Sequence, residues 1–211
     1  NSKKMRWYKG KSLLKMLETI NIDEIKKKEK LRLPIQWVNR LDSEFRGFSG
    51  TIVSGKIHKG DVISVLPNRN KAKISEIIVS GKKVLSASDK TAVTVTLDKE
   101  IDISRGDMLV KNDEPCEISN QFQVNLVWMT ETTGLIGRSH LIKIGHQSAG
   151  VQITNIKHKL NINSFEKLPA STLQLNDICL AEISLDKSII FDEYSNSRSL
   201  GSFIIIDRIT N

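Results

Sequence analysis

The run Gly10-Lys11-Ser12 matches the end of a phosphate-binding loop. Such a loop has the pattern Gly-x-x-x-x-Gly-Lys-Ser/Thr, in which backbone N–H groups and the Lys hold the phosphates of a nucleotide. Met5 stands where the first Gly is required, and no apolar strand precedes it. Asn70-Lys71 begins like the guanine-binding pattern Asn-Lys-x-Asp, but Lys73 replaces the Asp. The sequence therefore predicts that this chain does not bind GTP by itself, and that no residue of it holds a cofactor.

Histidine side chains can act in acid–base catalysis or bind metal ions, and the chain has four of them. His58 lies beside a predicted turn, and His140 and His146 flank a short apolar run. His158 falls on the apolar face of a predicted strand, where we expect a hydrogen-bonded core side chain. None has a cysteine or carboxylate at catalytic or metal-ligand spacing. We predict no catalytic residue and no metal site in this chain.

Cys116 and Cys179 lie far apart in the sequence, with no second Cys or His at ligand spacing. Two reduced thiols are therefore expected, not a zinc site or a disulfide framework. The carboxylates between residues 98 and 102 are interpreted as solvated loop charges, and Arg105-Gly106-Asp107 as a turn. The aromatic side chains expected in the core or between domains are Phe48, Trp37, Phe122 and Trp128.

The net charge of +8 is concentrated in one segment. Residues 1–32 hold 11 basic and 4 acidic residues, a net of +7, whereas the remaining residues hold 21 and 20, a net of +1. A nucleic-acid-binding protein typically has a basic face across its folded body. We interpret the basic segment as a solvated arm, with phosphate binding as the alternative.

The chain of 211 residues has an ordinary apolar content and no long apolar run. A membrane-spanning helix needs about 18 or more apolar residues in succession. No signal-peptide pattern opens the sequence. A soluble, cytoplasmic protein is the expectation.

Residues 46–67 show the pattern that dominates the chain, which is short β-branched runs separated by glycine. We expect two strands here, one containing Thr51-Ile52-Val53 and one formed by residues 62–66, with a reversal at Lys59-Gly60-Asp61. Residues 31–37 alternate, and this alternation predicts a strand that buries Leu31, Leu33, Ile35 and Trp37 on one face. About six short strands with close turn signals predict a small closed barrel.

A second set of strands follows a cluster of turn formers at residues 112–115. Its predicted strands cover residues 122–129, 140–144, 151–162, 178–185 and 203–206. The predicted fold class is all-β, with two consecutive small antiparallel barrels at residues 31–115 and 116–211. Before them, residues 1–30 predict a short helix, which Ser12 could cap, and a charged linker.

Two resemblances emerge from these segments. The pattern Gly50-x-Ile52-x-Ser54-Gly55 and its continuation to Gly60-Asp61 resemble the second domain of translational GTPases such as elongation factor Tu. The chain as a whole more closely resembles the large, GTP-binding subunit of bacterial sulfate adenylyltransferase. The segments that carry this second resemblance lie at residues 7–14, 33–40, 45–50, 100–109, 126–129, 137–139 and 201–208.

The resemblance implies a role for the whole protein. In that family, GTP hydrolysis by an N-terminal domain drives formation of adenosine 5′-phosphosulfate and pyrophosphate from ATP and sulfate. A separate small catalytic subunit performs the adenylyl transfer. The chain resembles the last helix of the GTPase domain followed by two barrels, so GTP and magnesium are implied only for the part upstream of residue 1.

We therefore expect a non-catalytic two-barrel unit that couples a GTPase domain to the small catalytic subunit. Arg40, Arg46 and Arg105 are predicted to be exposed near loop ends and are the candidates for contacts with that subunit. The alternative is an RNA-binding barrel module of a translational GTPase. A third interpretation is a barrel pair that only supports folding of the whole protein.

Overall fold

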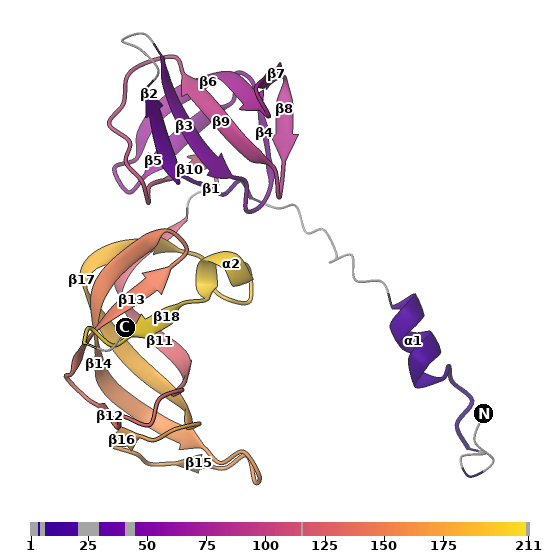
Figure 1. Cartoon of the computed structure of the whole chain (residues 1–211), viewed down its shortest axis with the longest axis vertical. Coiled ribbons are helices and arrows are strands. Elements are labelled where there is room, and N and C mark those ends of the chain that lie inside the picture. The colour runs from indigo at the N-terminus through magenta and orange to yellow at the C-terminus, as the bar shows by residue number, and fades with distance from the viewer. Residues whose placement is uncertain (1–3, 5–6, 21–29, 41–44, 115, 210–211) are drawn as a thin grey trace.

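The computed structural model describes residues 4, 7–20, 30–40, 45–114 and 116–209. It confirms the predicted all-β class, with two successive antiparallel β-barrels that follow a short N-terminal helix (Figure 1). In the described part of the chain, no helix is long and apolar enough to cross a membrane.

The first barrel has one main sheet in the order β1-β10-β5-β6-β9-β3-β2, with β7 paired to β6 and a separate β4–β8 pair. Every pairing in it is antiparallel. Its strands are β1 (Leu33–Pro34), β2 (Trp37–Arg40), β3 (Arg46–Thr51), β4 (Lys56–His58), β5 (Val62–Leu66), β6 (Asn70–Val79), β7 (Lys82–Val84), β8 (Ser86–Ser88), β9 (Ala92–Leu97) and β10 (Met108–Lys111).

The first barrel closes through a single chain segment. β1 and β2, the two ends of the sheet order, are successive parts of residues 33–40, so one segment pairs with β10 on one side and with β3 on the other. Between them, the Ile35 N–H donates to Asp107 O and the Gln36 N–H to Ser49 O, each at 2.8 Å. The enclosed core is almost entirely aliphatic, with Phe48 as its aromatic member.

The motif around Gly60 folds differently from the predicted pair of strands. The reversal at Lys59-Gly60-Asp61 is present, with Gly60 at φ 88°. However, it joins β4 to β5, and β3 ends at Thr51 and pairs with β2 and β9. The predicted direct pair was wrong because the chain leaves one side of the barrel after β3 and returns on the other.

The alternation predicted at residues 31–37 is confirmed only in part, since Leu31, Leu33 and Ile35 are buried as predicted. All five residues from Leu31 to Ile35 are buried, Arg32 included, whereas Trp37 is 62% exposed. The rest of the prediction failed because β1 ends at Pro34 and β2 begins at Trp37, and because the second barrel covers the face that carries Arg32.

The second barrel is a sheet in the order β11-β17-β14-β13-β18, with β15 paired to β14 and a separate β12–β16 pair. Three of its strands are long, and their inward side chains form much of an apolar core. Its elements are β11 (Glu117–Val127), β12 (Gly134–Leu135), β13 (Ser139–Ile144), β14 (Gln147–Leu160), β15 (Lys167–Leu168), β16 (Thr172–Leu173), β17 (Ile178–Phe191), α2 (Arg198–Gly201) and β18 (Ile204–Ile206).

The N-terminal helix α1 (Leu13–Thr19) begins where the sequence predicts. Ser12 is its N-cap, and the Ser12 Oγ accepts a hydrogen bond from the Lys15 N–H at 3.3 Å. This bond satisfies one backbone donor that the first helical turn leaves without a partner. None of its residues is buried, so the apolar stripe of α1 faces solvent in this structure.

Candidate functional site

The three predicted contact arginines occupy two places. Arg40 and Arg46 are directly opposite each other in the β2–β3 pair, and Arg40 is exposed. Arg46 was expected to be exposed, but it is half-buried. Its guanidinium lies 5.4 Å from the centre of the Phe48 ring and 3.9 Å from the Asp102 carboxylate. Arg46 is held against the barrel because its aliphatic stem and planar head pack on that ring.

Arg105 is exposed on the turn before β10 and faces the second barrel. Gly106 takes φ 100° there, and the Asp107 carboxylate accepts from the Ser104 N–H at 2.9 Å. Burial lowers the pKa of His146, and the charges of Arg105 and Lys143 lower it further. The turn predicted from Arg105-Gly106-Asp107 is therefore present, and it lies at the border between the barrels.

The histidines are distributed differently from the prediction. His158 is half-buried, whereas the buried histidine is His140, whose Nδ1 lies 3.0 Å from the carbonyl of Arg138. The His140 ring also meets Trp128 edge-on, with centroids 5.8 Å apart. Within the described residues, no group of three or more His, Cys, Asp or Glu side chains could hold a metal ion.

A buried ion pair joins the two barrels. Arg32, just before β1, is 2% exposed, and its Nε donates to the Asp192 Oδ2 at 2.8 Å. One terminal nitrogen of Arg32 donates to the carbonyls of Leu31 and Glu114, at 3.0 and 2.9 Å. Burial alone would lower the pKa of Arg32, but the hydrogen bond and charge of Asp192 outweigh it and raise the pKa. A charged pair at this depth requires such hydrogen bonding to be tolerated.

An apolar core surrounds this pair. Leu66, Met108 and Val110 of the first barrel pack with Ile190 and Leu200 of the second. Such a core links the barrels by the same burial of apolar surface that stabilises each of them. We call this region, from the Arg32–Asp192 pair to this core, the barrel junction.

Cys116 lies in the barrel junction, between the two barrels in the sequence. Its Sγ donates to the carbonyl of Phe191 at 3.0 Å. Burial raises the pKa of the Cys116 thiol to about 12. The thiol is therefore neutral at physiological pH and acts as a hydrogen-bond donor. Both cysteines are free, as predicted, and both are buried.

Four further hydrogen bonds lie at the barrel junction. The Leu31 N–H donates to the Glu114 carboxylate at 2.7 Å. The Gln36 side chain meets His146 across the barrels, with their Nε2 atoms 2.9 Å apart. Gln147 holds the backbone of Ile190 at both its N–H and its carbonyl. Polar and apolar contacts together make the two barrels one packed unit.

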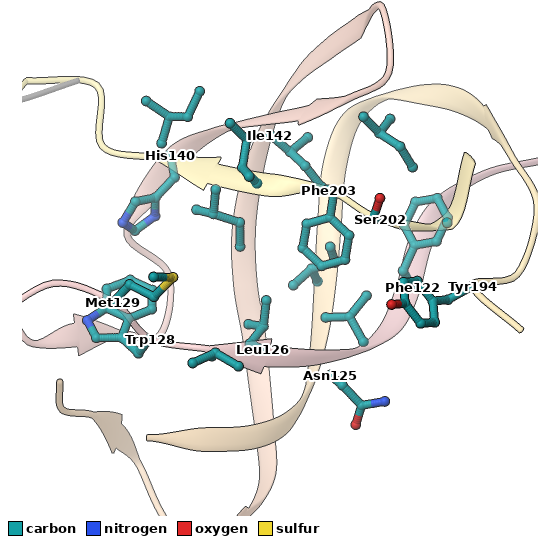
Figure 2. Close-up of a pocket in the computed structure, with 18 of the residues that line it drawn as sticks. Phe122, Asn125, Leu126, Trp128, Met129, His140, Ile142, Tyr194, Ser202 and Phe203 are labelled. Carbon is teal, nitrogen blue, oxygen red and sulfur yellow. The ribbon is translucent and has the colours of Figure 1, made fainter. Parts of the chain in front are cut away.

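A cleft opens in the second barrel (Figure 2). It has a volume of about 1010 Å³ and is lined mainly by apolar side chains. Trp128 and His140 lie at one end of the view, and Phe122 and Tyr194 at the other, with Phe203 between. Both β11 and β18 contribute to its lining. Four charged residues line it: Arg138 and Asp207 form an ion pair with each other, Asp192 pairs with Arg32, and Glu193 is exposed.

Sequence reasoning missed Arg32, Asp192 and the cleft. Arg32 and Asp192 are 160 residues apart, and neither lies in a sequence pattern that predicts an ion-pair partner. The only available signal was the run Leu31-Arg32-Leu33, in which a charged residue stands between two core residues. The aromatic prediction was right for Phe48 and Trp128, which are buried, and wrong for Trp37.

Comparisons with known proteins agree with the two-barrel fold. The family model described as GTP-eEF1A C-terminal domain-like matches residues 121–211, which span most of the second barrel. A crystal structure of sup35 complexed with GDP has a TM-score of 0.80 at 20% identity, covering 97% of this chain and 51% of that chain. At that identity, the match shows a shared fold alone.

The curated relatives are more similar in sequence. Sulfate adenylyltransferase subunit 1 of Aliivibrio fischeri (strain MJ11) is 43% identical over 210 residues, covering 100% of this chain and 44% of that protein. The bifunctional enzyme CysN/CysC of Xylella fastidiosa (strain Temecula1) is 40% identical, covering 100% of this chain and 34% of that protein. This chain spans less than half the length of these relatives. Over its whole length, the chain is similar to sulfate adenylyltransferase subunit 1 proteins.

Proposed function

We propose that this chain is the two-barrel part of the regulatory GTPase subunit of a sulfate adenylyltransferase. The observation that carries the proposal is similarity along the entire chain to subunit 1 proteins, at 43% identity in the Aliivibrio fischeri relative. The whole protein, which we call the parent, would take part in the reaction that converts ATP and sulfate to adenosine 5′-phosphosulfate and pyrophosphate. The part of the parent outside this chain would hold GTP and magnesium.

In this proposal the barrels act mechanically. The closed sheet of the first barrel resists bending, and a buried ion pair with an apolar core fixes the angle between the two barrels. A rotation imposed at one barrel therefore reaches the other without loss in a flexible linker. The unit couples the GTPase domain to the small catalytic subunit, which performs the adenylyl transfer.

The first experiment is co-elution of this chain with the small catalytic subunit on a sizing column, without nucleotide. A stable complex supports an interface on the barrels. If the full-length parent binds the small subunit and this chain does not, the interface lies on the GTPase domain and the coupling proposal fails. Binding of transfer RNA with a steep salt dependence would instead favour the RNA-binding alternative.

The arginines define a second test of the same interface. Charge reversal at the exposed Arg40 and Arg105, as Arg40→Glu with Arg105→Glu, is expected to lower affinity for the small subunit about tenfold. Arg46→Glu is measured separately, because its half-buried side chain also packs on Phe48. The matched control is Lys187→Glu, on the exposed part of β17. Unchanged affinity in both the double variant and Arg46→Glu would remove all three arginines from the interface.

A further inference from the structure

In the main sheet of the second barrel, the path of neighbouring strands from edge to edge contains five strands, and the sixth strand of the sheet, β15, pairs with β14 off this path. The order along this path is β11-β17-β14-β13-β18, and every neighbouring pair is antiparallel. The two edge strands, β11 and β18, therefore run in the same direction. An antiparallel sheet closes on itself only with an even number of strands, since neighbours must alternate in direction. One strand antiparallel to both edges would complete the alternation.

The first barrel shows how the same chain closes an antiparallel sheet. Residues 33–40 supply both ends of its order, so that six separate segments form the closed path. The second barrel lacks the equivalent segment, because β11 and β18 come from opposite ends of it. Among the described residues, neither β11 nor β18 pairs with a second strand.

The core of the second barrel is incompletely covered on this side. Phe122 and Val124 of β11, with Phe203 and Ile205 at β18, pack against the core but remain partly exposed. By contrast, inward residues of the central strands β14 and β17, such as Ile153 and Ile183, are 1% exposed. The apolar surface left open is therefore concentrated along the two edge strands.

The edges also lack the features that usually prevent pairing with another chain. Edge strands are commonly protected by lysine, proline or inward-pointing charges. Glu117, at its start, is the only charged residue in β11, and β18 is Ile204-Ile205-Ile206. Val127 and Ile204, one on each edge strand, line the cleft and are each 57% exposed. These edges are compatible with the addition of an uncharged strand.

The cleft is continuous with the barrel junction. Asp192 lines the cleft and also forms the buried ion pair with Arg32 of the first barrel. An occupant of the cleft therefore lies against the residues that fix the angle between the barrels. Arg138 and Asp207 neutralise each other and Arg32 neutralises Asp192, so that Glu193 is the remaining charged residue of the lining and the cleft offers little charge to an ionic partner.

We propose that the cleft between β11 and β18 receives an extended, uncharged, apolar segment of the small catalytic subunit. This segment adds between the two edges as a sixth strand and closes the path of neighbouring strands. This inference rests on the proposed function. Main-chain hydrogen bonds to both edges supply affinity, and alternate apolar side chains of the segment cover Phe122, Val124 and Ile205. Docking would thus reach the barrel junction directly.

The test compares edge-strand variants of this chain for binding to the small catalytic subunit by calorimetric titration. Val127→Lys and Ile204→Lys place a charge on each edge at exposed positions, where the cost to folding is small. Each is expected to weaken binding at least tenfold. The matched control is Ile162→Lys, because Ile162 is 61% exposed in the same barrel and does not line the cleft. Its affinity should stay within about twofold of the unchanged chain.

Hydrogen exchange of the same complex adds a readout specific to strand addition. Backbone amides of β11 and β18 should become at least tenfold more protected when the small subunit binds, since open-edge amides gain partners. Weakened binding without this protection would overturn the proposal, because side-chain docking alone would then explain the variants.

The remaining outcomes separate the two proposals. If this chain binds the small subunit and both edge variants bind equally well, the cleft proposal is wrong and the proposed function stands. If the unchanged chain does not bind while the full-length parent does, the proposed barrel interface is itself wrong. Sedimentation of the chain alone identifies a second copy as the occupant if β11 becomes protected on dimerisation, and that result also overturns the proposal.

Discussion

Arg32 carries a positive charge into the interior between the barrels, where water cannot solvate it. Its charge is compensated by Asp192 and its N–H groups by two backbone carbonyls. Exchanging a buried ion pair for apolar side chains often leaves stability unchanged, whereas removing one partner leaves an uncompensated buried charge. The value of this pair therefore lies in fixing one arrangement of the barrels.

We predict that Arg32→Met lowers the free energy of unfolding by about 3–5 kcal/mol. The loss arises because Asp192 keeps its charge in a largely buried site, and because the Leu31 and Glu114 carbonyls lose a donor. Urea denaturation followed by circular dichroism measures it. The control is Lys83→Met, which removes an exposed ion pair with Glu76 and should cost less than about 1 kcal/mol. Equal losses in both variants would contradict the structural role of Arg32.

At the scale of elements, the approach of β1 to β3 depends on Gly50. A Cβ on Gly50 would collide with the carbonyl oxygen of Pro34, and it would lie 3.0 Å from the Leu33 side chain. The contact with Pro34 is to backbone, which cannot move without disturbing the pairing of β1 with β10. Gly50 is therefore required because a Cβ would have no space at this position. Its backbone conformation does not itself require glycine.

Gly50→Ala is accordingly expected to destabilise the chain by about 3 kcal/mol, because β1 must shift or the core must overpack. Gly137→Ala is the comparison, since Gly137 has φ 80° but nothing near the position of the new Cβ. That variant should lose only about 1 kcal/mol, from the strained conformation alone. Thermal melting of both variants measures the difference, and a smaller loss at Gly50 than at Gly137 would refute the steric argument.

The sequence predicts local features of these elements well and long-range pairings poorly. The Ser12 cap and the reversal at Gly60 follow from residue conformational preferences, and both are present. The partners of β3 do not follow from local sequence, because sheet order is decided by packing among distant segments. The burial of Arg32 could not be predicted from local sequence for the same reason, because the second barrel covers its side chain.

At the scale of the whole molecule, the barrel junction makes the two barrels thermodynamically dependent. Its core includes fully buried side chains from both, such as Met108 and Ile190. Exposing this surface in one barrel alone would cost about 25 cal/mol for each Å² of apolar area. Neither barrel is therefore expected to unfold without weakening the other.

We predict a single cooperative unfolding transition in scanning calorimetry, with the calorimetric enthalpy equal to the van't Hoff enthalpy. Met108→Asp places a charge in the apolar core between the barrels and should separate the transition into two, one for each barrel. Leu85→Asp serves as the control, because Leu85 is highly exposed, and it should keep one transition. Two transitions in the unchanged chain would show that the barrels unfold independently.

The distance between Arg32 and Asp192 along the chain has a consequence during protein synthesis. Ribosomes add roughly 5–20 residues per second, so Arg32 is made about 10–30 s before its partner 160 positions later. During that interval, Arg32 must remain hydrated on the nascent first barrel. Any product that stops before Asp192 keeps this side chain in water and displays the apolar surface around Met108. The apolar surface of the barrel junction is thus covered only in chains that extend past Asp192, and shorter products leave it exposed to water.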